Sequence, residues 1–292
     1  MNNVAVAQEL DVPQLSLFGT TRQLVRPPLK WAGGKTRLLP VLRRSIPQAF
    51  GTYFEPFMGG AALFFDTSPQ TAVLGDSNPE LINFYEVLRD SPELLIEHLE
   101  RLTVSEAEFY RTRALEPLNL TPVERATRIL YLNKTCFNGL YRVNKRGEFN
   151  TPFGKQTKVN LFDRENLLAA SNALQFAKLK CADYLTIVKD ARRGDFVYFD
   201  PPYVPVSKFS DFKRYTKEFF SEEDQEELAA AFTALAERGC YVLLSNSFQD
   251  ETALRYAHFR QQKVFMPRFV NCKGDGRGNV TELLISNYEP QI

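Results

Sequence analysis

The stretch Asp195-Phe-Val-Tyr-Phe-Asp-Pro-Pro-Tyr203 decides the fold class. Residues Phe196–Phe199 are aromatic or β-branched, which predicts a short buried strand. Asp200 follows directly, at the carboxyl end of that strand, where open α/β sheets bind their ligands. Pro201 and Pro202 fix φ and lack N–H groups, so we expect a stiff turn with a free backbone carbonyl. The alternative is an ordinary strand-ending turn with a solvated aspartate.

A flat ring follows these oxygen acceptors at Tyr203. Acceptors beside a ring suit a flat donor group, such as the exocyclic amine of a nucleobase. The turn therefore predicts a binding site for a base amine at the edge of a sheet.

The composition is that of a soluble globular protein, with 292 residues, 44% hydrophobic and 24% charged. No apolar run is long enough to cross a bilayer, and residues 1–14 lack the basic start of a signal peptide. We therefore expect a cytoplasmic monomer whose residues 1–25 form a mobile extension. Four scattered cysteines and two histidines make a zinc site improbable, and we expect no metal.

Positive charge is concentrated in one segment. Between Arg125 and Lys158 there are eight basic residues and one acid, Glu148, so the segment carries +7 in a chain of net charge +1. Such a region is typical of a surface that binds a polyanion, although a solvated basic face is the alternative. Aromatic residues and glycines among the charges favour nucleic acid.

Two glycine-containing segments point to a nucleotide-type crevice. Leu29-Lys-Trp-Ala-Gly-Gly-Lys35 precedes an expected helix over 36–44, and its spacing is not that of a phosphate-binding P-loop. Its Trp31 belongs either to the core or to a ligand site. Tyr53–Ala62 is typical of a strand, a glycine turn and a helix start. Because Gly-x-Gly-x-x-Gly is missing, an adenosine cofactor without a pyrophosphate fits better than a dinucleotide.

Asp76 follows a second expected strand, over 71–74. An acid at this position holds ribose hydroxyls in nucleotide-binding folds. Alternatively it only leads into a helix, because Asn78 and Pro79 suit the N-cap and first helical position.

The middle of the chain predicts helices over 79–89, 92–102 and 121–133, the last with a capping box at Thr121. A hairpin should follow around Lys145-Arg-Gly147. The hairpin region contains residue types suited to duplex DNA: an arginine can read guanine, an aromatic ring can insert into the base stack, and an asparagine can pair with an exposed base edge.

The rest of the chain returns to an α/β pattern. We expect strands over 176–181 and 241–244, a helix from a capping box at Ser221 to Gly239, and a final hairpin over 263–269 and 282–286. The loop Cys272–Gly278 either touches DNA phosphates or is simply mobile.

Taken together, Leu29–Lys35, Phe54-Glu-Pro-Phe-Met-Gly-Gly60 and Asp200–Tyr203 strongly resemble the Dam-like, alpha-class (D12 class) family of adenine-N6 DNA methyltransferases. Asn138-Gly-Leu-Tyr-Arg142 and Arg146-Gly-Glu-Phe-Asn150 are similar to that family's recognition hairpin. The resemblance runs from Lys30 to about Tyr288. It implies an α/β, Rossmann-like methyltransferase sheet (26–90 and 163–292) with an inserted target-recognition domain (91–162).

The resemblance also implies the cofactor S-adenosyl-L-methionine. The implied cofactor contacts are Trp31, Lys35, Phe57, Asp76 and Asp200, with Asp183 and Tyr184 near the adenine of the cofactor.

Double-stranded DNA is the implied partner, with GATC as the expected target. Phe137 would enter the base stack, and Asn138 would meet the orphaned partner base. In the Dam proteins that we compare, the intercalating residue is tyrosine rather than phenylalanine, but stacking needs no hydroxyl. The residues implied to read flanking pairs are Lys30, Leu140, Arg142 and Pro152.

The implied reaction places the catalytic residues at Asp200, Pro201, Pro202 and Tyr203. An adenine must leave the duplex to reach a methyl donor. Asp200 and the Pro201 carbonyl would accept its two N–H bonds, and Tyr203 would stack on the ring. The alternatives are an RNA methyltransferase, a protein-amide methyltransferase, against which Asp200 counts, and an inactive DNA-binding module.

Overall fold

The computed structural model describes residues 25–144, 146–156, 159–202, 220–267 and 279–290. Two expected features, the N-terminal extension and the loop 272–278, lie outside these residues. The strands are β1 (Tyr53–Glu55), β2 (Ala72–Asp76), β3 (Ala177–Cys181), β4 (Phe196–Phe199), β5 (Tyr241–Ser247), β6 (Arg260–Pro267) and β7 (Asn279–Ser286). The helices are α1 (Leu39–Ser45), α2 (Ala62–Thr67), α3 (Pro79–Asp90), α4 (Pro92–Glu100), α5 (Glu106–Ala114), η1 (Pro117–Asn119), α6 (Pro122–Thr135), η2 (Phe137–Gly139), α7 (Arg164–Leu174), α8 (Tyr184–Val188), α9 (Glu222–Glu237) and α10 (Asp250–Arg255).

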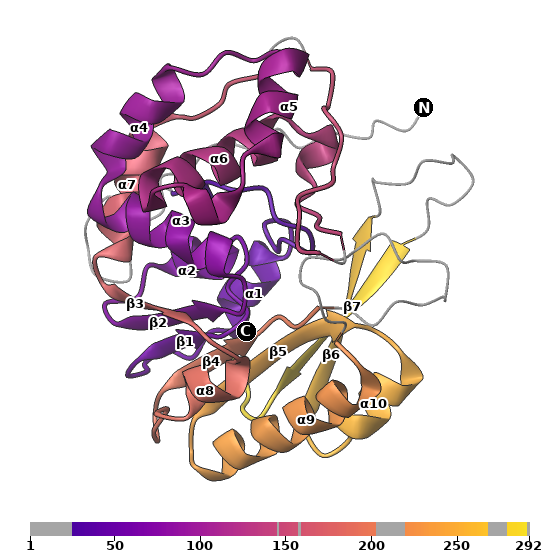
Figure 1. Ribbon diagram of the computed structural model, residues 1–292. Helices are drawn as coiled ribbons and strands as arrows, with labels where there is room; N and C mark the ends of the chain where they lie inside the picture. Colours follow the sequence, from indigo (N-terminus) through magenta and orange to yellow (C-terminus); the bar gives the residue numbers. More distant parts are fainter. Residues whose placement is uncertain (1–24, 145, 157–158, 203–219, 268–278, 291–292) are drawn as a thin grey trace, which may run out of the picture.

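The strands form one sheet of order β3-β2-β1-β4-β5-β7-β6 (Figure 1). Neighbouring strands from β3 to β5 are parallel, whereas β7 is antiparallel to both β5 and β6. This is the Rossmann-like methyltransferase sheet that the sequence predicts. The strand order reverses between β1 and β4, and such a switch point opens a ligand crevice at the carboxyl ends of the strands.

Alternating side chains separate the two faces of the sheet. Tyr53, Phe196 and Tyr198 belong to a core shared with α3 and α6, whereas Phe54 and Val197 belong to a second core with α8 and α9. Successive side chains of a strand point to opposite faces, which explains this division. Figure 1 shows the two groups of helices on opposite sides of the sheet.

The helix starts follow the predicted capping chemistry. Thr121 and Ser221 both form capping boxes, and the Asn78 side chain accepts from the amides of Glu80 and Leu81. Some predicted boundaries are wrong. The final hairpin is present but pairs Arg260–Pro267 with Asn279–Ser286 instead of 263–269 with 282–286, and the helix expected over 36–44 begins at Leu39. Its second residue is proline, which suits the first turn of a helix.

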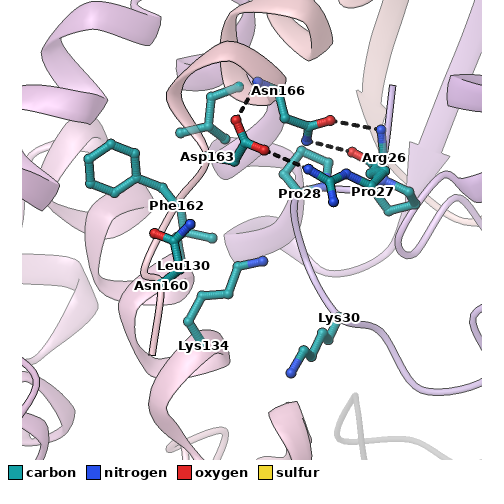
Figure 2. A pocket seen from close by; sticks show the side chains of 11 residues that line it. Arg26, Pro27, Pro28, Lys30, Leu130, Lys134, Asn160, Phe162, Asp163 and Asn166 are labelled. Atoms are coloured by element: carbon teal, nitrogen blue, oxygen red, sulfur yellow. Dashed lines mark hydrogen bonds and ion pairs between the residues drawn. The ribbon is translucent and has the colours of Figure 1, made fainter. Parts of the chain in front are cut away.

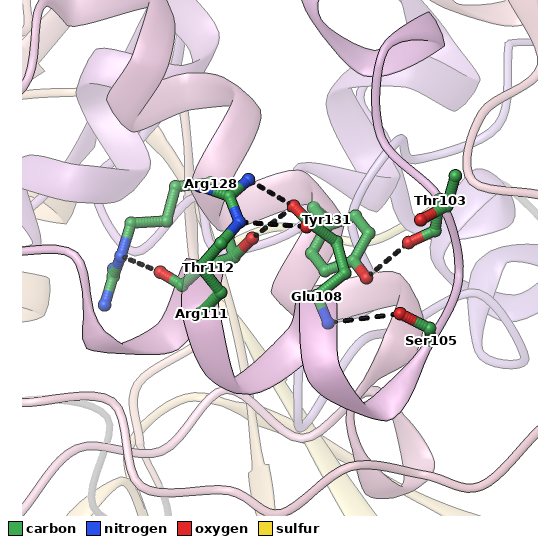
Figure 3. A network of polar contacts seen from close by, with 7 residues as sticks. All are labelled: Thr103, Ser105, Glu108, Arg111, Thr112, Arg128 and Tyr131. Atoms are coloured by element: carbon green, nitrogen blue, oxygen red, sulfur yellow. Dashed lines mark hydrogen bonds and ion pairs between the residues drawn. The ribbon is translucent and has the colours of Figure 1, made fainter.

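A buried cation joins α5 to α6 (Figure 3). The Arg128 guanidinium donates to the carbonyls of Thr112 (3.1 Å) and Arg113 (2.9 Å). The Tyr131 hydroxyl donates to the carbonyl of Thr103 at 2.8 Å.

Because α4, α5 and α6 share one core with α3, the predicted domain boundary at residue 91 does not coincide with a break in packing. The domain division stays a prediction.

The predicted basic hairpin is present as a short antiparallel pairing. Val143 lies opposite Phe149, the Asn150 amide donates to the Arg142 carbonyl, and the Asn144 amide donates to the Glu148 carbonyl, both at 2.9 Å. Lys145, at its tip, lies outside the described residues. Among the helices of the described ranges, none has the length and apolar character needed to span a membrane.

Candidate active site

Asp200 lies directly after β4, at the carboxyl edge of the sheet. Its Oδ1 atom is 2.6 Å from Lys35 Nζ and accepts a hydrogen bond from Ser245 Oγ at 3.0 Å. The Asp200 side chain is 18% exposed, so the turn is not sealed inside the core. Lys35 belongs to the Trp31 loop, and the contact therefore joins two motifs that are far apart in the sequence.

The charge state of Asp200 is set by opposing effects. Burial raises the pKa of this carboxyl, while Lys35, through its charge and its hydrogen bond, and Ser245 act in the opposite direction. The Lys35 side chain is itself buried and also donates to the Gly33 carbonyl at 2.9 Å. Burial is the largest of these effects, so the pKa of Asp200 is raised, and Lys35 and Ser245 limit that rise by favouring the ionised form.

Ser245 was missed by the sequence analysis, which ended the fifth strand at Leu244. In the structure β5 continues to Ser247, with Ser245 fully buried. Tyr198 pairs with Leu243 across the parallel strands β4 and β5, and two further residues bring Asp200 level with Ser245 on the same face. The sequence signal that could have found Ser245 is the change from apolar residues to Ser-Asn-Ser at the carboxyl end of β5, where the strand reaches the site.

Trp31 packs against the glycine turn after β1. Its ring stacks on Tyr141 with centroids 5.0 Å apart. Gly59 has φ +43°, and a Cβ there would lie 2.6 Å from Trp31 Cδ1, so only glycine fits without displacing the indole. Trp31 is partly exposed, and it connects the loop, the glycine turn and the recognition segment.

The structure confirms that Asp76 leads into a helix, while its ribose-holding role stays a prediction. Its carboxylate accepts from the amides of Asn78 (2.9 Å) and Gly59 (3.2 Å), so it leads into α3 and also holds the glycine turn. Burial raises the pKa of Asp76 to about 6, although backbone hydrogen bonds act against the increase. The side chain remains partly exposed at the carboxyl end of β2.

Aromatic rings line the neighbouring part of this edge. Phe57 stacks on Tyr184 with centroids 5.1 Å apart, and it also contacts Phe199. The Tyr184 hydroxyl donates to Glu227 at 2.8 Å, and Asp183 caps α8 through the Thr186 amide at 2.9 Å. Phe57 and Asp183–Tyr184 are thus gathered beside the glycine turn.

A second buried carboxylate, Glu55, was not singled out from the sequence. Glu55 ends β1 and accepts a hydrogen bond from the Tyr53 hydroxyl at 2.8 Å. Burial raises the pKa of Glu55 to about 8, and the charge of Asp200 contributes in the same direction. Near pH 7 the Glu55 carboxyl is therefore largely protonated, and it lies beside Asp200 without a full negative charge.

The six residues predicted to contact DNA, here called the recognition cluster, come together at one place: Lys30, Phe137, Asn138, Leu140, Arg142 and Pro152. Phe137 is 49% exposed, its amide donates to the Pro152 carbonyl at 2.9 Å, and Asn138 has a left-handed φ of 57°. The Leu140 carbonyl accepts from the Thr151 hydroxyl at 2.6 Å. These contacts hold two sides of the hairpin region together.

Arg142 and Lys30 are each held by an asparagine. Arg142 Nε donates to Asn150 Oδ1 at 2.7 Å. Asn133, fully buried, accepts from the Lys30 amide (2.9 Å) and donates to the carbonyls of Lys30 (2.7 Å) and Gly139 (3.2 Å). Asn133 therefore fixes the loop before Trp31 to the tip that carries Phe137, a link that the sequence analysis missed.

Part of the basic segment does not form a solvated cationic face. Arg125 pairs with Glu80 at 2.5 Å, and Arg128 is buried against backbone carbonyls. The expectation that all charges between 125 and 158 form one polyanion footprint is wrong for these two arginines. Burial of the Arg128 guanidinium lowers its pKa, which is the cost of using a cation to connect helices.

A cavity of about 300 Å³ lies between the 26–30 segment and the end of α6 (Figure 2). Its lining includes Arg26, Lys30, Lys134 and Asn160. Arg26 is paired with Asp163 at 2.5 Å. Burial, helped by the charges of Lys30 and Arg26, lowers the pKa of Lys134 to about 8. The cavity is thus a cationic recess beside the recognition cluster.

Of the predicted catalytic residues, Asp200, Pro201 and Pro202 lie together after β4, with Pro201 buried and Pro202 exposed. Tyr203 lies outside the described residues. Within the ranges that the structure describes, no group of three or more His, Cys, Asp and Glu side chains could hold a metal ion.

Comparison with known proteins identifies the family. A family model for D12 class N6 adenine-specific DNA methyltransferases matches residues 31–265. The chain is 41% identical over 282 residues to the type II methyltransferase M1.LlaDCHI of Lactococcus lactis subsp. cremoris, covering 94% of this chain and 99% of that protein. It is 38% identical over 287 residues to the type II methyltransferase M.MjaIII of Methanocaldococcus jannaschii, with coverages of 90% and 99%.

A third relative carries the name that the sequence resemblance suggests. The DNA adenine methylase of Vibrio cholerae is 36% identical over 261 residues, with 88% of this chain and 94% of that protein covered. The matched region includes Trp31–Lys35, the glycine turn, Asp200 and every residue of the recognition cluster except Lys30. With its Rossmann-like sheet and the motifs gathered at one edge, the chain belongs to the D12 class N6 adenine-specific DNA methyltransferase family.

Proposed function

We propose that this protein transfers a methyl group from S-adenosyl-L-methionine to N6 of an adenine flipped out of double-stranded DNA, within GATC. One observation carries the proposal. Asp200, at the switch point of the sheet, is paired with Lys35, which favours its ionised form, and the same loop carries Trp31, which packs on the glycine turn and on Tyr141 of the recognition segment. A carboxylate acceptor is therefore available where the base amine and the methyl donor would meet.

The chemistry of the site fits the proposed cofactor. Asp76 offers a partly exposed carboxylate to ribose hydroxyls, and the half-buried ring of Phe57 offers a flat surface to adenine. With a pKa of about 6, Asp76 is largely ionised near pH 7 and gives this edge a negative charge that suits a sulfonium cation, whereas Glu55, with a pKa of about 8, is largely protonated. When bound, the cofactor supplies an electrophilic methyl group. Trp31 and Lys35 complete the proposed wall of this pocket.

Asp200 and Pro201 supply the proposed activation. Adenine N6 is a poor nucleophile because its lone pair is delocalised into the ring. If Asp200 and the Pro201 carbonyl accept its two N–H bonds, the nitrogen becomes pyramidal and its lone pair points out of the ring plane. Aligning that lone pair with the methyl donor can contribute several kcal/mol, on the order of the larger positioning effects known for enzymes.

The recognition cluster supports duplex DNA as the substrate. Phe137 is an exposed aromatic ring on a short rigid turn, suited to fill the gap that a flipped base leaves. Asn138 lies beside it for the partner base. Asn150 holds Arg142 through its Nε atom and through one terminal nitrogen, at 2.7 and 3.3 Å, which orients the guanidinium for contact with a guanine. Leu140, Pro152 and Lys30 complete this surface.

Expression in a host that lacks adenine methylation tests the proposal. Sequencing of the host DNA should reveal N6-methyladenine, with the modified adenine in GATC. A labelled-methyl assay on total RNA in parallel should give no incorporation. Methylation of RNA alone, or cofactor binding with no methylated product, would overturn the proposal. Methylation of adenine in another sequence would overturn only the target assignment.

Lys134 allows a prediction on DNA affinity. A phosphate in the cationic recess favours the charged form of Lys134, so DNA binding should take up a proton and weaken as pH rises through about 8. The variant Lys134→Gln should bind more weakly, lose this pH dependence and show a salt slope smaller by about 1. Fluorescence anisotropy at pH 7, 8 and 9 and three salt concentrations measures both effects.

The matched control is Lys189→Gln, which removes an exposed lysine just after α8. Its DNA affinity and salt slope should equal those of the wild type. If both variants weaken binding equally, a general charge effect explains the result and Lys134 has no specific contact.

A further inference from the structure

We propose that Ser245, itself held by Tyr198, is a positioning residue that orients the Asp200 carboxylate toward the base amine. This inference rests on the proposed function. It assigns a role in methyl transfer to two residues for which the sequence predicted none, Tyr198 on strand β4 and Ser245 on strand β5.

The hydrogen bonds form a chain with a fixed direction. Ser245 Oγ donates to Asp200 Oδ1 at 3.0 Å, and Tyr198 OH lies 2.9 Å from Ser245 Oγ. A serine hydroxyl has one proton and an ionised carboxylate has none to give. Since the serine proton points to Asp200, the tyrosine must donate to the serine. The chain therefore runs from Tyr198 through Ser245 to Asp200.

The chain lies where water cannot substitute for it. Ser245 is 0% exposed and Tyr198 is 1% exposed. The Ser245 hydroxyl can direct its proton to Asp200 because it accepts from Tyr198. Loss of Ser245 removes one of the two donors to Asp200, and loss of the Tyr198 hydroxyl removes the group that orients the serine proton. In either case the carboxylate gains rotational freedom.

Both donors act on the same carboxylate oxygen. Lys35 Nζ and Ser245 Oγ both contact Oδ1 of Asp200. Because Ser245 lies on strand β5 and Lys35 lies in the Trp31 loop, the two donors approach Asp200 from different elements and restrict rotation about its Cβ–Cγ bond. Oδ2 is thereby kept in one direction as the acceptor for the base N–H.

The fold explains why this chain is rigid. Tyr198 and Ser245 lie on adjacent parallel strands in the middle of the sheet, in the register Tyr198↔Leu243. Because β5 is paired on both sides, with β4 and β7, Ser245 cannot shift without breaking the sheet. A carboxylate held from such a strand is better positioned than one held from a loop.

The test is a double-mutant cycle in methyl transfer. Ser245→Ala should lower kcat about tenfold, since a loosened acceptor is misplaced, while KM for DNA and cofactor affinity stay within about twofold. Tyr198→Phe, which keeps the ring, should lower kcat about threefold. The double variant should be no slower than Ser245→Ala alone, because both substitutions interrupt one chain.

Two controls separate positioning from stability. Ser286→Ala removes a buried hydroxyl of the neighbouring strand β7 that donates to the Tyr288 carbonyl, and Tyr131→Phe removes a tyrosine hydroxyl that donates to the Thr103 carbonyl. Both should lower the melting temperature at most as much as the test variants and leave kcat unchanged. A purely structural role of Ser245 predicts the same behaviour for all four variants.

Each result decides the matter. Three results would overturn the inference: an unchanged kcat for folded Ser245→Ala, losses that multiply in the double variant, or equal losses of kcat in the controls. The proposed function would still stand in each case, provided that the wild type methylates adenine in DNA. A wild type that does not methylate adenine in DNA would overturn the proposed function and this inference with it.

Discussion

Asp200→Ala is expected to abolish detectable adenine methylation, with a rate loss of at least about 10³-fold, while duplex binding persists. Asp200 supplies the acceptor for the base amine, and no neighbouring carboxylate can replace it, because Glu55 is bound to the Tyr53 hydroxyl inside the core. The DNA contacts proposed for Phe137 and Arg142 lie on a different segment. Single-turnover methylation and an electrophoretic binding assay on the same duplex separate the two effects.

Asp200→Asn sharpens this test, because it keeps the shape of the side chain. Lys35 and Ser245 are both donors and would take the only remaining oxygen of the amide. The amide nitrogen then faces the base amine, and two donors oppose each other. We therefore expect Asp200→Asn to be slower than the wild type by at least about 10²-fold, despite its nearly identical volume.

Asp195 provides a matched control at the opposite end of β4. Its carboxylate is buried and accepts from the amides of Thr52 and Arg192, both at 2.8 Å. Asp195→Ala should lower the melting temperature but leave the methylation rate per folded molecule unchanged. Undiminished turnover of Asp200→Ala, or an equal loss in Asp195→Ala, would contradict the assignment.

Local patterns explain what the sequence could predict. The strand Phe196–Phe199 and the start of α6 at Thr121 depend on residues within a few positions of one another, and the structure confirms both. The placement of Asp200 at the carboxyl edge of a parallel sheet follows from the strand alone, because that edge is where such sheets bind ligands. The motifs then supplied the remaining sites through resemblance to a family.

Long-range contacts explain what the sequence could not predict. Asn133 bonds to Lys30, 103 positions away, and neither residue signals the other in the sequence. Arg128 looks like a DNA-binding cation, yet its guanidinium caps the carbonyls of another helix. Ser245 reaches Asp200 only because β5 is parallel to β4 in one register. Charge and hydrogen-bonding type are visible in a sequence, but the partner that uses them is not.

Lys35→Met is expected to slow methylation about 10- to 100-fold at neutral pH and to move the acid limb of the kcat profile to higher pH. Lys35 is the largest influence that opposes the burial of Asp200, so its removal raises the pKa of Asp200 further. A carboxyl group with a raised pKa is protonated over a wider range, and only its ionised form accepts two N–H bonds freely. Raising the pH should therefore restore part of the lost rate.

This recovery distinguishes the ion pair from a simple cofactor contact. If Lys35 only binds the cofactor, Lys35→Met should raise the cofactor KM and leave the acid limb in place. Lys35→Arg should keep the acid limb of the kcat profile near that of the wild type, because the positive charge beside Asp200 Oδ1 is retained. This should hold even if the larger guanidinium fits poorly, since the Lys35 side chain is only 6% exposed. A limb that does not move in Lys35→Met would mean that Asp200 stays ionised without its partner, and the structural basis for its activation would then lie in Ser245 alone.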